Sequence, residues 1–260
     1  MNLRNLFKKK DPEPEPEREP EWIPPSDEPA RCRFMLLWAN CGRSYLESQI
    51  AEGGEPNESL PDLQAWVVGP LAVFATQEEL ARHAKPAGTW SERDIINDSW
   101  DREAAVMLAW ALGLLDSPPP LDVAADWAPE ADEFFDFPDP KTWRTDLKLR
   151  DADSLEHMAQ SFEAMYWRLR TIGREGDLDY ARKLMGRAHR LGQVDLASDG
   201  DLALSDGRSI IQADDEELGA FTSIAIERLQ ALNWLCGQDP DWDEITCDTI
   251  VSWLWDENWS

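Results

Sequence analysis

The segment from Trp100 to Leu115, WDREAAVMLAWALGLL, constrains the fold more than any other part of the chain. Charged residues occupy its first turn, and nearly every later residue is apolar. A helix that is apolar on all sides must be covered by other elements, whereas a surface helix keeps a polar face. We therefore predict a core helix in the centre of a helical domain, ended by the run Pro118, Pro119 and Pro120.

Two regions before this core helix also show helical patterns. Apolar residues at helical spacing follow Pro29 and continue until Gly53, which predicts a first long helix. Shorter helices are expected around residues 62–68 and after Thr76, since Thr76 and Glu79 have the spacing of a capping box.

Two further helices are predicted after a long surface loop that reaches Pro140. The first begins near Asp153, which has Glu156 at capping distance, and it stops near Gly173. The second fits residues 178–191 and is followed by a glycine.

The last long helix is expected to start at Asp214, where Glu217 completes a capping box, and to include the sequence ERLQALNWL. We expect its leucines to be buried against the core helix: Leu229, Leu232 and Leu235. Asp241 and Glu244 should then start one short turn.

The β signal is confined to residues 201–211. Leu202 and Leu204 alternate there with polar residues before Asp206 and Gly207, a preferred pair for a tight hairpin turn. Two strands are stable only when they pack on other elements. The predicted fold is thus mainly α, a single irregular multi-helix domain with one small β-hairpin.

The composition divides the chain into three parts. Residues 1–28 begin with ten residues that hold four basic side chains and continue as a Pro/Glu-rich spacer, which predicts a disordered tail capable of weak membrane contact at most. Residues 29–249 form the expected helical domain. Residues 250–260 form a Trp-rich extension that would dock on the body or form an interaction surface through Trp253, Trp255 and Trp259.

Charge narrows the range of partners. With 25 basic and 52 acidic side chains, the chain has a formal net charge of −27. Nucleic-acid binding needs clustered basic residues, so we do not expect it, whereas a basic protein partner is plausible beside the simpler reading of an acidic, solvated surface. No apolar run is long enough for a transmembrane segment, and a cytoplasmic protein with free thiols is expected.

The sequence lacks the usual motifs of catalytic and cofactor-binding sites. Its four cysteines and three histidines do not have zinc-ligand spacing, and there is no nucleophile elbow or phosphate-binding loop. The acidic residues after Trp242, which are Asp243, Glu244 and Asp248, are more simply explained by capping and solvation. We predict no metal and no cofactor.

One pair of charged residues stands out against this background. Glu103 falls on the apolar stripe of the core helix, and Arg228 lies in a comparable place on the last long helix. If the two helices pack together, the side chains can form a structural ion pair. The alternative is a pocket among the tryptophans in which Glu103 and Arg228 bind a small ligand or act in catalysis.

Several segments together carry a family resemblance. WDREAAVMLAWALG, LRDADSLEHMAQSFEAMYWRLR at residues 149–170, and ERLQALNWL with DWDEITCDT make the chain resemble a bacterial family, domain of unknown function 4272. The resemblance covers roughly residues 31–249 and implies an α-helical fold, without any catalytic residue to carry over. We accordingly expect a non-catalytic protein-interaction module rather than an enzyme.

Overall fold

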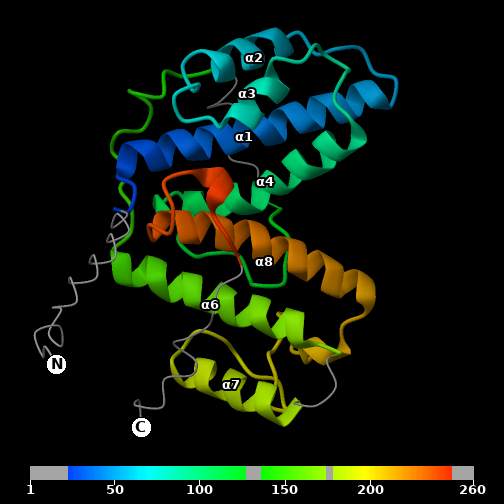
Figure 1. The fold of residues 1–260 in the computed structure, drawn as a ribbon, viewed down its shortest axis with the longest axis vertical. Coiled ribbons are helices and arrows are strands. Elements are labelled where there is room, and N and C mark those ends of the chain that lie inside the picture. Colours follow the sequence, from blue (N-terminus) through cyan, green and yellow to red (C-terminus); the bar gives the residue numbers. More distant parts are fainter. Residues whose placement is uncertain (1–22, 127–135, 174–177, 248–260) are drawn as a thin grey trace, which may run out of the picture.

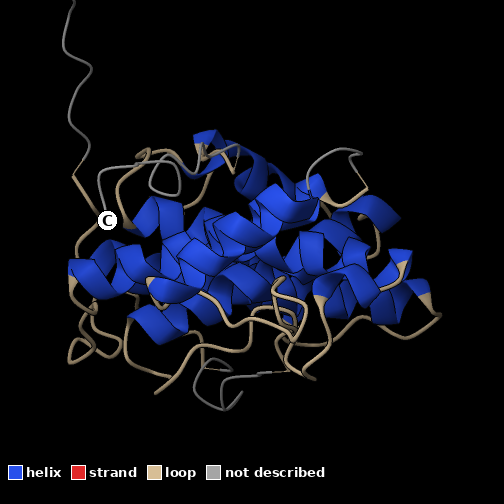
Figure 2. Cartoon of the chain, turned by 90° about the horizontal axis from the view of Figure 1, so that it is seen from below, coloured by secondary structure: helices blue, strands red, loops and turns tan. Residues whose placement is uncertain are grey.

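The computed structural model describes residues 23–126, 136–173 and 178–247. This part of the chain is mainly helical, as predicted (Figure 1). Figure 2 shows the helices as one packed array with the irregular connections running along its outside. The predicted tail and the predicted Trp-rich extension, with Trp253, Trp255 and Trp259, lie outside the described residues.

The helices differ in length, and the longest ones form the centre of the array. In chain order they are α1 (Asp27–Ala51), α2 (Leu60–Val68), α3 (Gln77–His83), α4 (Glu92–Ala111), α6 (Ala152–Thr171), α7 (Leu178–Arg190) and α8 (Asp215–Leu235), with short 3-10 turns η1 (Ile210–Gln212) and η2 (Trp242–Glu244).

The helices are arranged in a row along the long axis of the molecule. α2 packs on α3 and α1, α1 on α4, α4 on α8, α8 on α6, and α6 on α7 (Figure 1). α4 and α8 are therefore covered on both sides, which explains why the second half of α4 is apolar all round. The predicted leucines of α8 are at most 1% exposed: Leu229, Leu232 and Leu235.

Capping sets most of the helix starts that the sequence predicted. The side chains of Thr76 and Glu79 form a reciprocal capping box at α3, and those of Asp214 and Glu217 form another at α8. Asp241 accepts a hydrogen bond from the backbone of Asp243 and starts η2. These predictions are confirmed.

The core helix α4 is longer at its start and shorter at its end than predicted. It begins at Glu92 because Ser91 and Asp94 form a capping box ahead of the polar first turns. It ends before the prolines, since Gly113 adopts a φ of +78° and Leu114 N–H donates to the Ala109 carbonyl. Glycine reaches this left-handed conformation without strain, so it terminates the helix first.

Two other local predictions are wrong. The cap of α6 is Asp151, whose carboxylate accepts from the Ser154 backbone, and it is not Asp153. The predicted hairpin is present only as isolated antiparallel bridges, Leu196 with Leu202 and Ala203 with Ser209, and the described residues contain no regular strand. The second arm stops early because the chain coils into η1 directly after Ser209.

Among the helices of the described residues, none combines the length and the apolar character that a membrane span requires.

Candidate functional site

Glu103 and Arg228 form an ion pair between α4 and α8. Arg228 Nη2 and Nε donate to Oε2 of Glu103 over 2.6 and 2.9 Å, and both side chains are 0% exposed. Burial lowers the pKa of Arg228, although the Glu103 charge opposes this shift. The guanidinium is also stacked 5.6 Å from the centre of the Phe162 ring, so the pair is enclosed by apolar side chains.

The same two residues hold the loop that follows α4. Arg228 donates to the carbonyls of Pro120 and Val123 over 2.7 Å each, and Glu103 accepts from the Ala125 N–H over 2.8 Å. Each strong donor and acceptor is thus engaged inside the protein, and neither side chain is accessible to a ligand in this structure. The geometry is that of a structural ion pair, the first of the two predicted readings.

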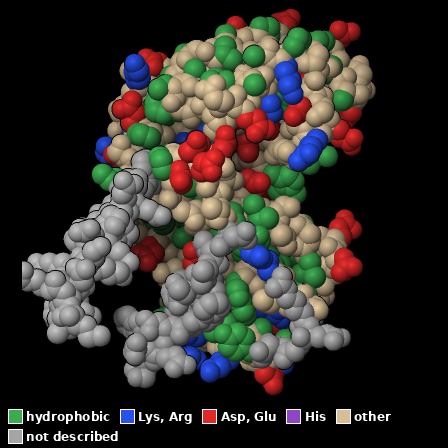
Figure 3. Space-filling view, in the orientation of Figure 1, with side chains coloured by type: hydrophobic (Ala, Val, Ile, Leu, Met, Phe, Trp, Pro, Cys, Tyr) green, Lys and Arg blue, Asp and Glu red, His purple; other side chains and the backbone are tan. Residues whose placement is uncertain are grey.

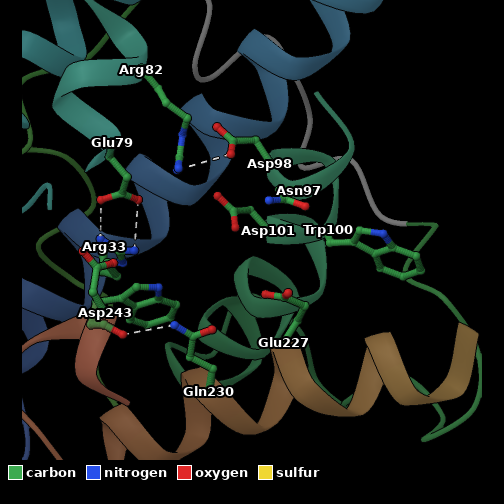
Figure 4. A pocket seen from close by; sticks show the side chains of 11 residues that line it. Arg33, Glu79, Arg82, Asn97, Asp98, Trp100, Asp101, Glu227, Gln230 and Asp243 are labelled. Carbon is green, nitrogen blue, oxygen red and sulfur yellow. Dashed lines mark hydrogen bonds and ion pairs between the residues drawn. The ribbon is translucent and has the colours of Figure 1, made fainter. Parts of the chain in front are cut away.

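A second cluster of charged residues lines an open pocket of about 300 Å³. The pocket lies where α1, α3, the first half of α4, α8 and η2 meet (Figure 4). Its carboxylates are Glu79, Asp98, Asp101, Glu227 and Asp243, and its guanidinium groups are those of Arg33 and Arg82. Five carboxylates against two guanidinium groups leave a formal charge of −3 when all are ionised.

One wall of the pocket is a tightly bonded polar network. Arg33 forms a two-pronged ion pair with Glu79, with N–O distances of 2.9 and 3.0 Å. The amide nitrogen of Asn40 donates to Glu79 over 2.8 Å and to Asp101 over 2.7 Å. His83 Nε2 lies 2.8 Å from the Asn40 amide oxygen. Burial and the nearby Arg43 charge lower the pKa of His83 to about 3, so the ring is neutral and donates to Asn40.

Asp98 and Arg82 form the opposite side. Arg82 Nη2 lies 3.2 Å from Oδ1 of Asp98, whose residue is only 2% exposed. The second oxygen, Oδ2, is buried and accepts no hydrogen bond. A buried carboxylate oxygen that accepts no hydrogen bond costs folding free energy. A donor supplied to Oδ2 by a ligand would therefore be stabilising.

Glu227 projects from α8 toward the same space. In Figure 4 its carboxylate lies between α8 and α4, whereas that of Asp101 points from α4 toward α1, where Asn40 donates to it. Glu227 is half-buried, and within the described residues it makes no hydrogen bond or ion pair. It is a carboxylate in an acidic, poorly solvated place without a compensating cation.

The electrostatics follow from this arrangement. Burial raises the pKa of Glu227 to about 8, and the charges of Asp101, Glu103 and Asp98 add to the effect. Burial likewise raises the pKa values of Asp98 and Asp101. The charge of Asp101 adds to the effect on Asp98, and the charge of Glu79 adds to the effect on Asp101. Glu79 behaves differently: burial opposes its ionisation, but the Arg33 charge and several hydrogen bonds lower its pKa.

Tryptophans flank the carboxylates. Trp100 is half-buried beside Asp101, and Trp242 is 8% exposed under the Arg33 guanidinium, which lies 4.0 Å from its ring centre. Indole rings attract cations through their electron-rich faces. The pocket therefore combines carboxylate acceptors with aromatic surface, the features expected around an organic cation. In the part of the chain that the structure describes, no group of three or more His, Cys, Asp or Glu could hold a metal ion.

Sequence reasoning found the ion pair but missed the pocket. The available signal was local: Asp98 and Asp101 lie three residues apart, so a helix places both on one face. Glu227 and Asp243 come from other elements, and their proximity to that face depends on the packing of α8 and η2.

Comparisons with known proteins add no further assignment. No protein-family model, curated protein or solved structure matches the chain. The resemblance to domain of unknown function 4272 stays a prediction.

Proposed function

We propose that the protein is a non-catalytic binding module whose acidic pocket takes the guanidinium or ammonium group of a basic protein partner. The observation that carries this proposal is Glu227, a half-buried carboxylate in the pocket with no hydrogen bond or ion pair in the described part of the chain. The buried, undonated Oδ2 of Asp98 supports it independently.

The chemistry of the pocket favours an organic cation over other ligands. The carboxyl groups of the pocket outnumber its guanidinium groups, so the pocket becomes negative as they ionise, and an anion is disfavoured. A guanidinium or ammonium group supplies several N–H donors, which Glu227 and the Oδ2 oxygen of Asp98 lack here, and its alkyl stem can contact Trp100. A volume of about 300 Å³ is at the lower end for ligand pockets, so one long basic side chain is a suitable occupant.

The direct test is a titration with single-residue probes. Nα-acetyl-arginine methylamide and Nα-acetyl-lysine methylamide are added to the purified chain, and binding is followed by the NMR signals of the tryptophan indoles. Nα-acetyl-citrulline methylamide and Nα-acetyl-norleucine methylamide are nearly isosteric but uncharged. We expect the charged probes to bind and their neutral counterparts not to bind.

Variants locate the binding. Glu227→Gln should weaken the binding of the arginine probe about tenfold, because it removes one charge partner from the pocket. Glu216→Gln is the matched control, since Glu216 is exposed on the same helix, α8, but about 16 Å further along it. Equal binding of arginine and citrulline probes, or equal effects of the two substitutions, would exclude the proposed function.

A further inference from the structure

A second cavity adjoins the acidic pocket. It has a volume of about 730 Å³ and shares Arg33, Trp242 and Asp243 with the acidic pocket. Most of its remaining lining is apolar or proline: Pro25, Pro29, Val73, Phe74, Ala75, Trp234 and Pro240. We call this cavity the apolar groove. It and the acidic pocket lie side by side, so together they match a ligand in which apolar and basic residues are neighbours.

The chain itself contains a segment of that composition. Residues 1–10, MNLRNLFKKK, hold four basic side chains and no acidic one, and Leu3, Leu6 and Phe7 directly precede the three lysines. Its apolar side chains match the apolar groove, and its basic side chains match the acidic pocket. Figure 3 shows acidic side chains gathered in the middle of the face, opposite in charge to this segment.

The attachment point of this segment is at the groove. Pro25 and Pro29, close to the first described residue, line the apolar groove. Arg33, which borders both cavities, lies six residues into α1, about 9 Å along the helix from Asp27. The connecting residues 11–22 can span up to about 40 Å, several times the distance along α1 from Asp27 to Arg33.

The charge of the connection also matters. Residues 11–22, DPEPEPEREPEW, contain six acidic side chains and one basic side chain. The acidic surface repels this spacer and attracts the basic segment beyond it. A tether of this length gives an effective concentration on the order of millimolar, so even a weak contact is partly occupied.

We propose that residues 1–10 dock on the same molecule, with the apolar side chains in the groove and the lysines at the acidic pocket. This inference rests on the proposed function, because it assigns the chain's own basic segment as a competitor of the cationic partner. Binding of the partner then requires displacement of residues 1–10.

Calorimetric titration tests the competition. The probe is a synthetic peptide of residues 1–10, amidated at its end, added to the full chain and to a chain that lacks residues 1–10. We expect the shortened chain to bind the peptide at least about fivefold more tightly, because its site is free. In the full chain, the combined change Lys8→Gln, Lys9→Gln and Lys10→Gln should recover the tighter binding.

Two controls separate specific docking from general attraction between opposite charges. A peptide of the same composition in scrambled order should bind the shortened chain more weakly. Within the shortened chain, Glu227→Gln should weaken peptide binding while Glu216→Gln should not.

Zero-length carbodiimide cross-linking, which joins amines to carboxylates, locates the segment. Mass spectrometry of the monomer should show links from Lys8, Lys9 or Lys10 to Glu227 or Asp243. Links found only in a covalent dimer would mean that the segment occupies a second copy, and this overturns docking on the same molecule.

The outcomes distinguish the two proposals. If the peptide binds the full and shortened chains equally, the competition is refuted while the pocket remains a cation site. If the arginine probe binds but the peptide does not, residues 1–10 are not a ligand. If neither binds, both proposals fail.

Discussion

Replacing Glu103 by Gln removes the negative charge that faces Arg228 while keeping the size of the side chain. The structure gives the expected magnitude. Both side chains are 0% exposed and lie 2.6 Å apart, so the variant leaves a buried guanidinium without its counter-charge. Breaking a buried pair in this way costs about 3–5 kcal/mol. Since domains have unfolding free energies of about 5–15 kcal/mol, such a loss is easily measured.

The assay is urea denaturation followed by tryptophan fluorescence and circular dichroism, with a matched surface pair as the control. Arg208 and Glu217 lie 2.7 Å apart, but their side chains are 40% and 34% exposed. Glu217→Gln keeps the capping box of α8, since Gln also serves at that position, and it should destabilise the protein far less than Glu103→Gln because solvent screens the exposed pair.

A second variant tests whether the cost comes from the isolated charge. Arg228→Met should also be strongly destabilising, because it leaves the Glu103 carboxylate buried and the carbonyls of Pro120 and Val123 without donors. The double variant should cost less than the sum of the two single ones by about 2 kcal/mol or more. Additive costs, or a Glu103→Gln loss no larger than that of Glu217→Gln, would refute the reasoning.

Two further predictions concern titration and reactivity. Burial and neighbouring acids raise the pKa of Glu227 to about 8 in the folded protein, so the folded state holds this proton more tightly than the unfolded state. The free energy of unfolding should therefore fall as the pH rises from about 5 to 8, by at most about 1.4 kcal/mol per pH unit for this group, and denaturation curves should show a shallower fall for Glu227→Gln than for Glu216→Gln. Burial raises the pKa of the Cys32 thiol to about 12, whereas Cys236 is exposed with a pKa raised to about 11. Ellman's reagent at pH 8 should thus label Cys236 first and Cys32 only after unfolding; rapid labelling of Cys32 in the folded protein would contradict its burial.

Local sequence signals account for much of the fold. Thr76 with Glu79 and Asp214 with Glu217 are capping boxes that satisfy backbone groups within four residues, so no tertiary information is needed to recognise them. The buried leucines of α8 are equally local, because they repeat at the helical period. The apolar pattern places the start of the core helix at Trp100 and not at Glu92, because residues 92–99 are mostly polar and show little apolar periodicity. The capping box of Ser91 and Asp94 marks the true start.

The two charged clusters show where sequence reasoning succeeds and fails for a site. Glu103 and Arg228 are single charged residues on otherwise apolar helix faces, so burial forces them to pair once α4 packs on α8. The acidic pocket has no such signature. Its residues come from five elements, and each carboxylate in isolation resembles an ordinary solvated side chain. Only the packing of α8 against α4 places Glu227 close to Asp101.

The central claim is that the acidic pocket binds a cationic group through its ionised carboxylates, and the pH dependence of that binding tests it most directly. Nα-acetyl-arginine methylamide stays charged throughout pH 6–8, so only the protein titrates. Glu227, Asp98 and Asp101 all have raised pKa values, and each carboxyl group that loses its proton on binding makes the affinity rise by up to about tenfold per pH unit over this range; the dependence should be weaker in Glu227→Gln. An affinity that is independent of pH, or that increases on acidification, would contradict the account.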